Sequence, residues 1–320
     1  MSEGKDSGKF SIYLEYGKLL DFFKIAKSVS YDGRLQFEDS KMSVIEINLQ
    51  NAVGLKLVMD IPKNHENVVS LDNLLSGTKK KYLVEFKNVL NILSAFNFKS
   101  DLIKCTIDET NNIILFEPKT SVEGLNRRGF VPILTNKFSR RKSLESLDDF
   151  VMKYGDDYTF MQIKVKCDDL YSAIRCISKM EHNSWVDDII LLGSNQGLTV
   201  SSSIPEICLT GKNQSVLNVP YFSITIPFSE ELGCPDNIFV GAKSEKEWVA
   251  SAFDSGYLLD FLNVLPKNCI LTVSVSTNCV GMIETNLRGI SLRYGIAPRT
   301  SDEKTRIIED AYAKLIMLRD

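Results

Sequence analysis

The chain has 320 residues, of which 44% are hydrophobic, and a formal net charge of -3. This is enough apolar material for one large domain or two of ordinary size. The slight acidic excess excludes a uniformly basic nucleic-acid-binding protein, so such a role would need basic side chains gathered on one face. No apolar run approaches the roughly 20 residues of a membrane-spanning helix, and the polar start from Met1 to Phe10 has no signal-peptide core. We therefore expect a soluble protein that is not secreted.

Cysteine and histidine usage argues against metal sites. The cysteines number 7, an odd count, and no two are spaced C-x-x-C, so we expect reduced thiols that behave as small hydrophobic residues. The only histidines, His65 and His182, lie far apart in the sequence. This arrangement disfavours zinc sites and histidine-based nucleophilic triads, and we expect no cofactor.

The first half of the chain alternates strand and helix patterns. A helix over 17–28 places Leu19, Phe22, Phe23 and Ala26 on one apolar face, and a second helix is predicted over 85–96. Period-2 alternation predicts strands over 10–14, 33–37, 42–49, 54–59, 102–107 and 112–118. Residues 129–134 predict an edge strand, where Pro132 is tolerated.

The second half repeats this order. Helices are predicted over 168–180 and 255–265. Strands are predicted over 160–165, 188–192, 197–201, 207–211, 269–276, 279–285 and 290–294. Repetition of a whole unit indicates two tandem copies of one fold. Helices placed between hairpins of an antiparallel sheet tend to lie together on one face, so we expect an α+β architecture with the sheets outside.

These patterns divide the chain into five segments. We predict a disordered N-terminus over 1–9, a first domain over 10–135, a linker over 136–157, a second domain over 158–299 and a helical extension over 300–320. The linker contains the basic run from Arg140 to Ser143, which fits a kinase site, an extra phosphate contact or a solvated loop. Thr300 and Glu303 have the spacing of a capping box that would introduce the last helix.

Enzymatic motifs are missing from the sequence. It contains neither a G-x-x-x-x-G-K-[ST] loop nor a G-x-G-x-x-G turn after a strand, so nothing supports a nucleotide-binding cradle. The acidic pairs Asp156–Asp157, Asp168–Asp169 and Asp187–Asp188 could be imagined in metal-dependent phosphoryl chemistry. Each lies in a loop or at a helix start, where the helix dipole favours carboxylates anyway. We expect no enzyme.

Two segments of the second half carry a resemblance to a known family. The stretch from Ser251 to Leu262, followed by Leu292-Arg-Tyr-Gly-Ile-Ala-Pro-Arg299, resembles the closing segment of proliferating cell nuclear antigen (PCNA), a DNA sliding clamp. Residues 10–28 resemble the first strand and helix of that family, and residues 39–49 its strand leading to the partner pocket. Helix 168–180 resembles its third helix. The resemblance covers roughly 10–125 and 158–299 at the level of pattern.

The resemblance implies two tandem sliding-clamp domains, with four helices lining the hole of a ring. Three such subunits would encircle double-stranded DNA independently of its sequence. The chain would act as a polymerase processivity factor that tethers DNA polymerase and other replication or repair proteins. A clamp loader would open the ring, and the expected location is the nucleus or a viral replication site.

Basic residues on the four predicted helices are the candidate DNA contacts, because a clamp neutralises phosphates without reading bases. They are Lys18, Lys24, Lys27, Lys87, Lys99, Arg175, Lys179 and Lys267. The family's central basic positions fall on Asn91, Ser94 and Asn263 here, so we expect a weaker grip on the second and fourth helices. Taken singly, these lysines and arginines also fit ordinary solvated helix residues.

The resemblance also implies a partner-binding pocket. Its candidate residues are Val44, Pro132, Ile133, Tyr294, Ile296 and Pro298. Gly295 stands where the family has an aromatic residue, which would shorten one wall of the pocket. The alternative for each candidate is packing in the core or at the edge of a sheet.

Two other functions fit the same sequence. The incomplete basic lining and the long linker favour a subunit of a heterotrimeric checkpoint clamp of the nine-one-one type. A clamp fold, for instance a viral one, could also serve as a transcription or scaffold factor.

Overall fold

The computed structural model divides into two compact units. Unit 1 comprises Met1–Leu49, Gly54–Leu147 and Asn286–Leu292, and unit 2 comprises Gln50–Val53, Asp148–Thr285 and Arg293–Asp320. The structure describes residues 9–38, 40–48, 50, 52–62, 80–96, 102–119, 127–134, 160–180, 188–202, 222–232, 239–240, 248–277 and 279–299. The predicted linker over 136–157, the strand over 207–211 and the helix over 300–320 lie outside these residues.

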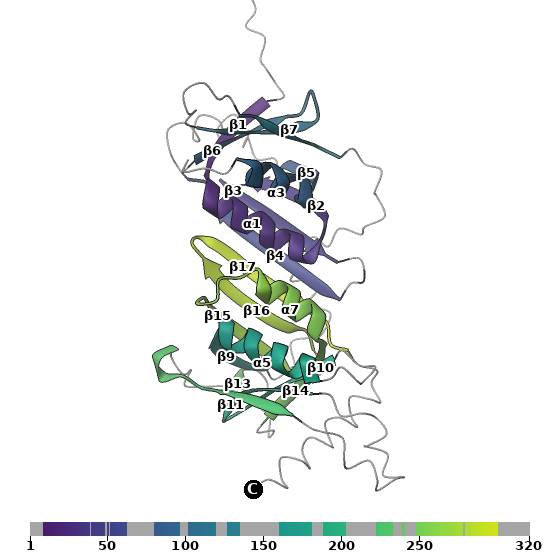
Figure 1. Cartoon of the computed structure of the whole chain (residues 1–320), viewed down its shortest axis with the longest axis vertical. Helices are drawn as coiled ribbons and strands as arrows, with labels where there is room; N and C mark the ends of the chain where they lie inside the picture. The colour runs from purple at the N-terminus through teal and green to yellow at the C-terminus, as the bar shows by residue number, and fades with distance from the viewer. Residues whose placement is uncertain are drawn as a thin grey trace, which may run out of the picture. The chain divides into compact units, whose positions relative to one another are not determined.

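Unit 1 contains antiparallel strands in two sheets (Figure 1). The first sheet has the order β1 (Lys9–Glu15), β6 (Leu102–Asp108), β7 (Ile113–Pro118) and β8 (Gly129–Pro132). The second has the order β4 (Val53–Asp60), β3 (Lys41–Ile47), β2 (Asp32–Glu38) and β5 (Lys80–Glu85). Buried and less buried residues alternate along β1 and β3, as in strands with one face on a core.

Helices α1 (Tyr16–Val29) and α3 (Phe86–Ala95) lie side by side in unit 1 (Figure 1). α1 contacts β1 and β3, and α3 contacts β2, β5 and β8, so the core lies between the helix pair and the strands. Phe23 of α1 meets Phe86 of α3 with the ring centroids 5.9 Å apart, within the range of favourable aromatic pairs. Gly129 allows β8 to approach α3, because a Cβ there would lie 2.3 Å from Cγ2 of Ile92.

Unit 2 also contains two groups of antiparallel strands. One sheet has the order β12 (Ser223–Pro227), β11 (Gly197–Ser202), β10 (Asp188–Ser194) and β14 (Trp248–Asp254). In the other, β13 (Phe239–Val240), β9 (Phe160–Lys166), β15 (Ile270–Ser276) and β16 (Gly281–Leu287) follow in that order. A turn at Arg288 and Gly289, both with positive φ and both belonging to unit 1, leads into β17 (Ile290–Ile296), as in tight hairpins of primed type. A short 3₁₀ turn spans Glu230–Leu232.

Helices α5 (Cys167–Met180) and α7 (Ser255–Asn263) lie side by side in unit 2 (Figure 1). Phe261 of α7 stacks on Tyr294 of β17 with the ring centroids 3.9 Å apart and the ring planes 8° from parallel. The Tyr294 hydroxyl donates a hydrogen bond of 3.1 Å to the carbonyl of Tyr257, so this buried polar group is satisfied. This stack closes the helix pair onto the strands of its own unit.

The two units repeat one plan at the junctions of strand and helix. In all four cases the helix begins at the residue after the strand ends: β1 runs into α1, β5 into α3, β9 into α5 and β14 into α7. The predicted α+β architecture of two tandem units with antiparallel sheets is confirmed. None of the helices among the described residues is both long enough and apolar enough to cross a membrane.

Four strands were not predicted, and one boundary was wrong. β5, β12, β13 and β14 lie where the sequence analysis expected no strand. The central residues of β14, among them the small residues Ala250, Ser251 and Ala252, are buried on both faces of the strand. β14 therefore lacks the alternation of apolar and polar residues that reveals a strand. β1 begins at Lys9, which falls inside the segment predicted to be disordered.

Candidate nucleic-acid interface

The exposed face of α1 carries lysines. Lys24 and Lys27 are exposed and spaced three residues apart, so they lie on one side of the helix. Lys18 is half-buried, and its Nζ donates a hydrogen bond of 2.7 Å to Oε1 of Glu15. Of the three predicted DNA contacts on α1, two are therefore open to solvent and unpaired with other described residues, while Lys18 is partly neutralised.

The exposed face of α3 has one basic residue. Lys87, Asn91 and Ser94 are exposed at helical spacing, while Phe86, Val89 and Leu93 face the core. Asn91 and Ser94 can donate or accept hydrogen bonds but carry no charge. The helix can thus attract a phosphate only through Lys87. Lys99, the further candidate beyond this helix, lies outside the described residues.

The charge on the exposed face of α5 changes from negative to positive along the helix. Asp168, Ser172, Arg175 and Lys179 are exposed with spacings of four, three and four residues. The acidic end falls in the first turn, where the helix dipole stabilises a carboxylate, and Lys179 falls in the last turn. Arg175 and Lys179 therefore form a basic patch only toward the C-terminal half of α5.

A group of four residues, here named the Tyr171 cluster, joins α5 to the turn after α7. Nζ of Lys267 lies 3.5 Å from the centroid of the Tyr171 ring and 3.4 Å from Oδ1 of Asp168. The guanidinium carbon of Arg175 lies 5.9 Å from the same ring centroid. Because cations are attracted to the negative face of an aromatic ring, Tyr171 holds both in place.

The exposed face of α7 is not basic. Gly256, Asp260 and Asn263 are exposed at spacings of four and three residues. The sequence analysis placed Asn263 at this face but missed Asp260, which the spacing of three residues would have revealed. An acidic residue here repels phosphate, so α7 contributes to an anion-binding surface only through Lys267 beyond its end.

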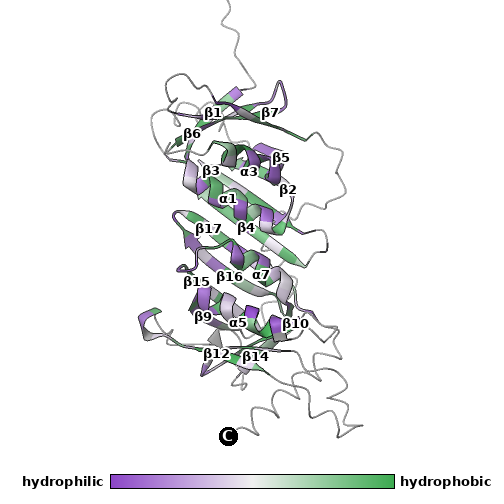
Figure 2. Ribbon diagram, in the orientation of Figure 1, coloured by the Kyte–Doolittle hydropathy of each residue, from purple (hydrophilic) through white to green (hydrophobic). Residues whose placement is uncertain are grey.

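Hydrophobic and hydrophilic residues occur together on each of the four helices (Figure 2), and burial separates them by face. In unit 1 the structure brings Lys24, Lys27 and Lys87 onto one helix pair. In unit 2 it brings Arg175, Lys179 and Lys267 onto the other. Among the described residues, no three potential ligands come together to hold a metal ion. Each basic face can neutralise phosphates without reading bases.

The candidates for a partner pocket separate into two groups. Val44, Tyr294 and Ile296 are buried in the cores of their own units. Their side chains cannot contact a docked partner in this structure, which corrects the prediction for these three because they serve packing. Pro132 is exposed, and Ile133 and Pro298 are half-buried, so these three remain available.

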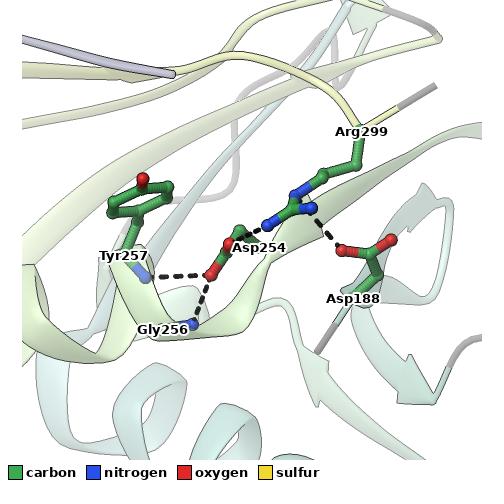
Figure 3. Close-up of polar contacts among 5 residues, drawn as sticks. All are labelled: Asp188, Asp254, Gly256, Tyr257 and Arg299. Carbon is green, nitrogen blue, oxygen red and sulfur yellow. Dashed lines mark hydrogen bonds and ion pairs between the residues drawn. The ribbon is translucent and has the colours of Figure 1, made fainter. Parts of the chain in front are cut away.

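Arg299, the last residue of the described chain, forms a polar network with its neighbours that the sequence analysis missed (Figure 3). We name it the Arg299 network. The guanidinium of Arg299 binds Asp254 and lies 3.4 Å from Oδ1 of Asp188, and the backbone N–H of Arg299 donates 2.8 Å to the carbonyl of Ala252. Hydrogen bonding to Asp254 raises the pKa of Arg299, so the charge is permanent. Asp254 also accepts from the backbone N–H groups of Gly256 and Tyr257 and thereby caps α7.

Neither the protein-family models nor the curated proteins contain a match to the chain. Solved structures do match. PCNA from Thermococcus kodakaraensis has a TM-score of 0.61 at 12% identity, with 91% of this chain and 99% of that chain covered. A. fulgidus PCNA, solved with the C-terminal region of FEN-1 bound, has a TM-score of 0.60 at 15% identity and coverages of 92% and 99%.

PCNA from Entamoeba histolytica gives a TM-score of 0.60 at 10% identity, with 92% of this chain and 99% of that chain covered. At such identities the likeness concerns the fold, and it spans both units and nearly the whole of each relative. The resemblance that the closing segment carried is thereby confirmed at the level of structure. The chain has the sliding-clamp fold of PCNA, in a form that has diverged strongly in sequence.

Proposed function

We propose that the chain is a subunit of a DNA sliding clamp, a non-catalytic ring that encircles double-stranded DNA. The observation that carries this proposal is the placement of lysines and arginines on the exposed faces of helices in a PCNA fold. Lys24 and Lys27 on α1 and Arg175 and Lys179 on α5 are exposed. Such residues bind the phosphate backbone independently of base sequence, which is what a sliding protein requires.

Two sheet edges support assembly into a ring. β8 is the last strand of one sheet in unit 1, and β12 is the last strand of one sheet in unit 2. Phe130 on β8 is 64% exposed, and Phe222, directly before β12, is 39% exposed. Exposed strand edges with apolar side chains favour pairing with another chain. Pairing of β8 with β12 of a second copy would be head-to-tail, and such contacts generate closed rings when the rotation closes.

Tethering of replication or repair proteins is the second part of the proposal. The FEN-1 segment bound to the A. fulgidus relative is an example of a protein docked on this fold. In this chain Pro132, Ile133 and Pro298 are the accessible apolar candidates for such docking. The ring would need a loader to open it, and it would work in a nucleus or at a viral replication site.

A mixed ring is the second candidate. The exposed faces of α3 and α7 carry Asn91, Ser94, Asp260 and Asn263, so their attraction for phosphate is low. Another chain could supply the missing charge. A complex of PCNA2 with PCNA3 from Sulfolobus tokodaii, matched with a TM-score of 0.59 at 11% identity, shows two different chains of this fold together.

The assembly is tested by light scattering coupled to size-exclusion chromatography. We expect a mass three times that of the 36.1 kDa chain. Phe130→Asp should give a monomer, whereas Tyr31→Asp, another exposed aromatic, should leave the mass unchanged. If the wild type is a monomer, co-expression with similar-sized chains from the same genome separates a mixed ring from no ring.

The DNA contact is tested on linear duplex DNA with blocked or open ends. A ring threaded on the DNA is retained only when the ends are blocked. Simultaneous replacement of Lys24, Lys27, Arg175 and Lys179 by Ala should abolish most of this retention. It should also reduce the magnitude of the slope of log K against log salt by at most about 3.6, which corresponds to about 0.9 for each phosphate contact removed. Unchanged retention would mean that α1 and α5 do not face DNA.

A further inference from the structure

Two cysteines face each other where β9 and β15 meet α5 in unit 2. In the antiparallel pairing of these strands, Lys166 lies opposite Ile270. One step further, Cys167 lies opposite Cys269, and the N–H of Cys167 donates 2.9 Å to the carbonyl of Cys269. Directly opposed residues of an antiparallel pair point to the same face, with Cα atoms about 4.5–5.5 Å apart. This lies within the range of about 4.4–6.8 Å that a disulfide spans.

The two sulfur atoms differ in accessibility. Cys167 is 0% exposed, and its thiol lies 3.7 Å from the carbonyl of Leu262. Cys269 is half-buried, in the turn between α7 and β15. A small oxidant can therefore reach the sulfur of Cys269 before it reaches the buried sulfur of Cys167.

We propose that Cys167 and Cys269 form a redox-active dithiol, which a hydroperoxide converts into a disulfide joining the start of α5 to the start of β15.

The polarity of the thiol pair assigns the order of reaction. Interaction with the Cys167 side chain lowers the pKa of Cys269. Interaction with Cys269, together with burial, raises the pKa of Cys167. Because the thiolate is the nucleophile, Cys269 reacts first and Cys167 resolves the product.

The two steps balance with hydrogen peroxide as the oxidant. The Cys269 thiolate attacks one peroxide oxygen and the O–O bond breaks, which gives a sulfenic acid at Cys269 and hydroxide, protonated to water. The Cys167 thiol then attacks the Cys269 sulfur, forming the S–S bond and releasing the sulfenic oxygen as a second water. Overall, two thiols and one peroxide give one disulfide and two waters, so peroxide is reduced as sulfur is oxidised.

The other described cysteines lack this arrangement. Burial raises the pKa of Cys105 to about 12 and also raises the pKa of Cys279, which makes both thiols poor nucleophiles. Cys176 is half-buried on α5 and provides a matched control on the same helix. Among the described cysteines, Cys167 and Cys269 are the pair that lies directly opposed, one step beyond the paired ends of β9 and β15.

The cross-link would restrain the turn from Pro266 to Cys269, which carries Lys267 of the Tyr171 cluster. It would also close a long loop between the two cysteines, since α5 begins at Cys167 and β15 follows Cys269. Such a closure stabilises the folded chain by restricting the unfolded one. Oxidation should therefore make unit 2 more resistant to unfolding.

Peptide mapping of the full chain tests the proposal. The protein is treated with hydrogen peroxide at equimolar and tenfold ratios, free thiols are blocked with N-ethylmaleimide, and trypsin digestion follows without reductant. Cleavage after Lys166, Arg175, Lys267 and Arg288 yields peptides 167–175 and 268–288. We expect these two peptides to be linked through Cys269 and to separate on reduction. Cys279→Ser assigns the bond, because Cys279 lies in the second peptide.

The thermal midpoint provides an independent readout. Oxidation should raise it by about 5–10 °C in the wild type and in Cys176→Ser. Cys269→Ser should show no such rise. Cross-links of Cys269 to any other cysteine, or Cys167 and Cys269 both blocked by N-ethylmaleimide after peroxide treatment, would overturn the proposal. Neither result depends on ring assembly or DNA binding, so the proposed clamp function is tested separately.

Discussion

The helix pair of unit 1 and the helix pair of unit 2 follow the same plan but present different charges to solvent. On α1, Lys24 and Lys27 are exposed and form no ion pair with another described residue. In unit 2, Lys267 is already engaged by Asp168 and Tyr171, and Asp260 stands on the exposed face of α7. The fold requires an apolar face on each helix, whereas the opposite face is free to diverge in charge.

This difference has a consequence for the proposed binding of DNA through phosphate contacts. A lysine that already has a carboxylate partner must give up that partner, or share it, to bind a phosphate. Unit 1 should therefore supply more of the salt-dependent binding than unit 2. The following experiments test that inequality and the local structure on which it depends.

The largest effect is expected from removing the basic pairs one unit at a time. The double substitution Lys24→Ala and Lys27→Ala should reduce the magnitude of the slope of log K against log salt by about 1.8. Arg175→Ala with Lys179→Ala should lower it by less, because Arg175 already lies against Tyr171 and Asp168 is exposed on the same helix. Fluorescence anisotropy with duplex DNA at several salt concentrations measures both slopes. Equal slopes would show that the two units grip DNA alike.

A charge reversal on α7 should reduce the difference between the two units in salt-dependent DNA binding. Asp260→Lys removes a carboxylate from the exposed face and adds an ammonium group. The magnitude of the slope of log K against log salt should therefore increase by about 0.9. Asp260→Asn is the matched control and should strengthen binding without this rise in slope. The same anisotropy titration measures both variants. If Asp260→Lys binds no better than the wild type, α7 does not face the DNA.

The helices of the two units also differ in their caps. Asp254 accepts hydrogen bonds from two backbone N–H groups at the start of α7, whereas the N-cap residues of α1 and α3, Glu15 and Glu85, form no side-chain cap. Asp254→Ala should lower the free energy of unfolding by about 1 kcal/mol, and it also removes the partner of Arg299. Glu85→Ala should change it by no more than about 0.5 kcal/mol. Urea denaturation followed by circular dichroism compares them.

The smallest effect concerns acid stability in unit 1. Hydrogen bonds from the side chain and backbone of Asn111, together with Lys9, lower the pKa of Asp108. A folded-state pKa below the unfolded value of about 3.9 contributes stability above that pH. The contribution is lost as the pH falls through the folded-state value. Asp108→Asn should therefore flatten the acid limb of a stability profile measured by urea denaturation between pH 7 and pH 2.

A steeper acid limb in Asp108→Asn than in the wild type would contradict this assignment. Lys9→Met removes one of the interactions that lower the pKa and should shift the acid limb toward higher pH. The shift should be smaller than the effect of Asp108→Asn, because the Asn111 hydrogen bonds remain.

Sequence periodicity predicted the four helices to within two residues at each end, since each has a core face and an exposed face at helical spacing. It missed β5, which begins with Lys80 and Lys81, and β14, whose central residues are buried on both faces. A strand of this kind is recognisable only through its neighbours, here the pairing of β14 with β10.

The site was harder to predict than the fold. Spacing alone identified the exposed positions of Lys24, Lys27, Arg175 and Lys179 correctly as helix-face residues. It could not show that Lys267 lies on Tyr171, because that contact joins residues far apart in the sequence. Nor could it distinguish a pocket wall from a core, which is why Tyr294 was taken for a partner contact although it stacks on Phe261.

The Arg299 network has a mechanical consequence. The side chain grips Asp254 and approaches Asp188, while its backbone binds Ala252, so three points of β14 and β10 converge on one residue. A pulling force applied to the chain beyond Arg299 would be distributed over these anchor points before it reached the core. In an optical-tweezer experiment on a C-terminally tethered chain, Arg299→Ala should lower the force at which unit 2 first yields.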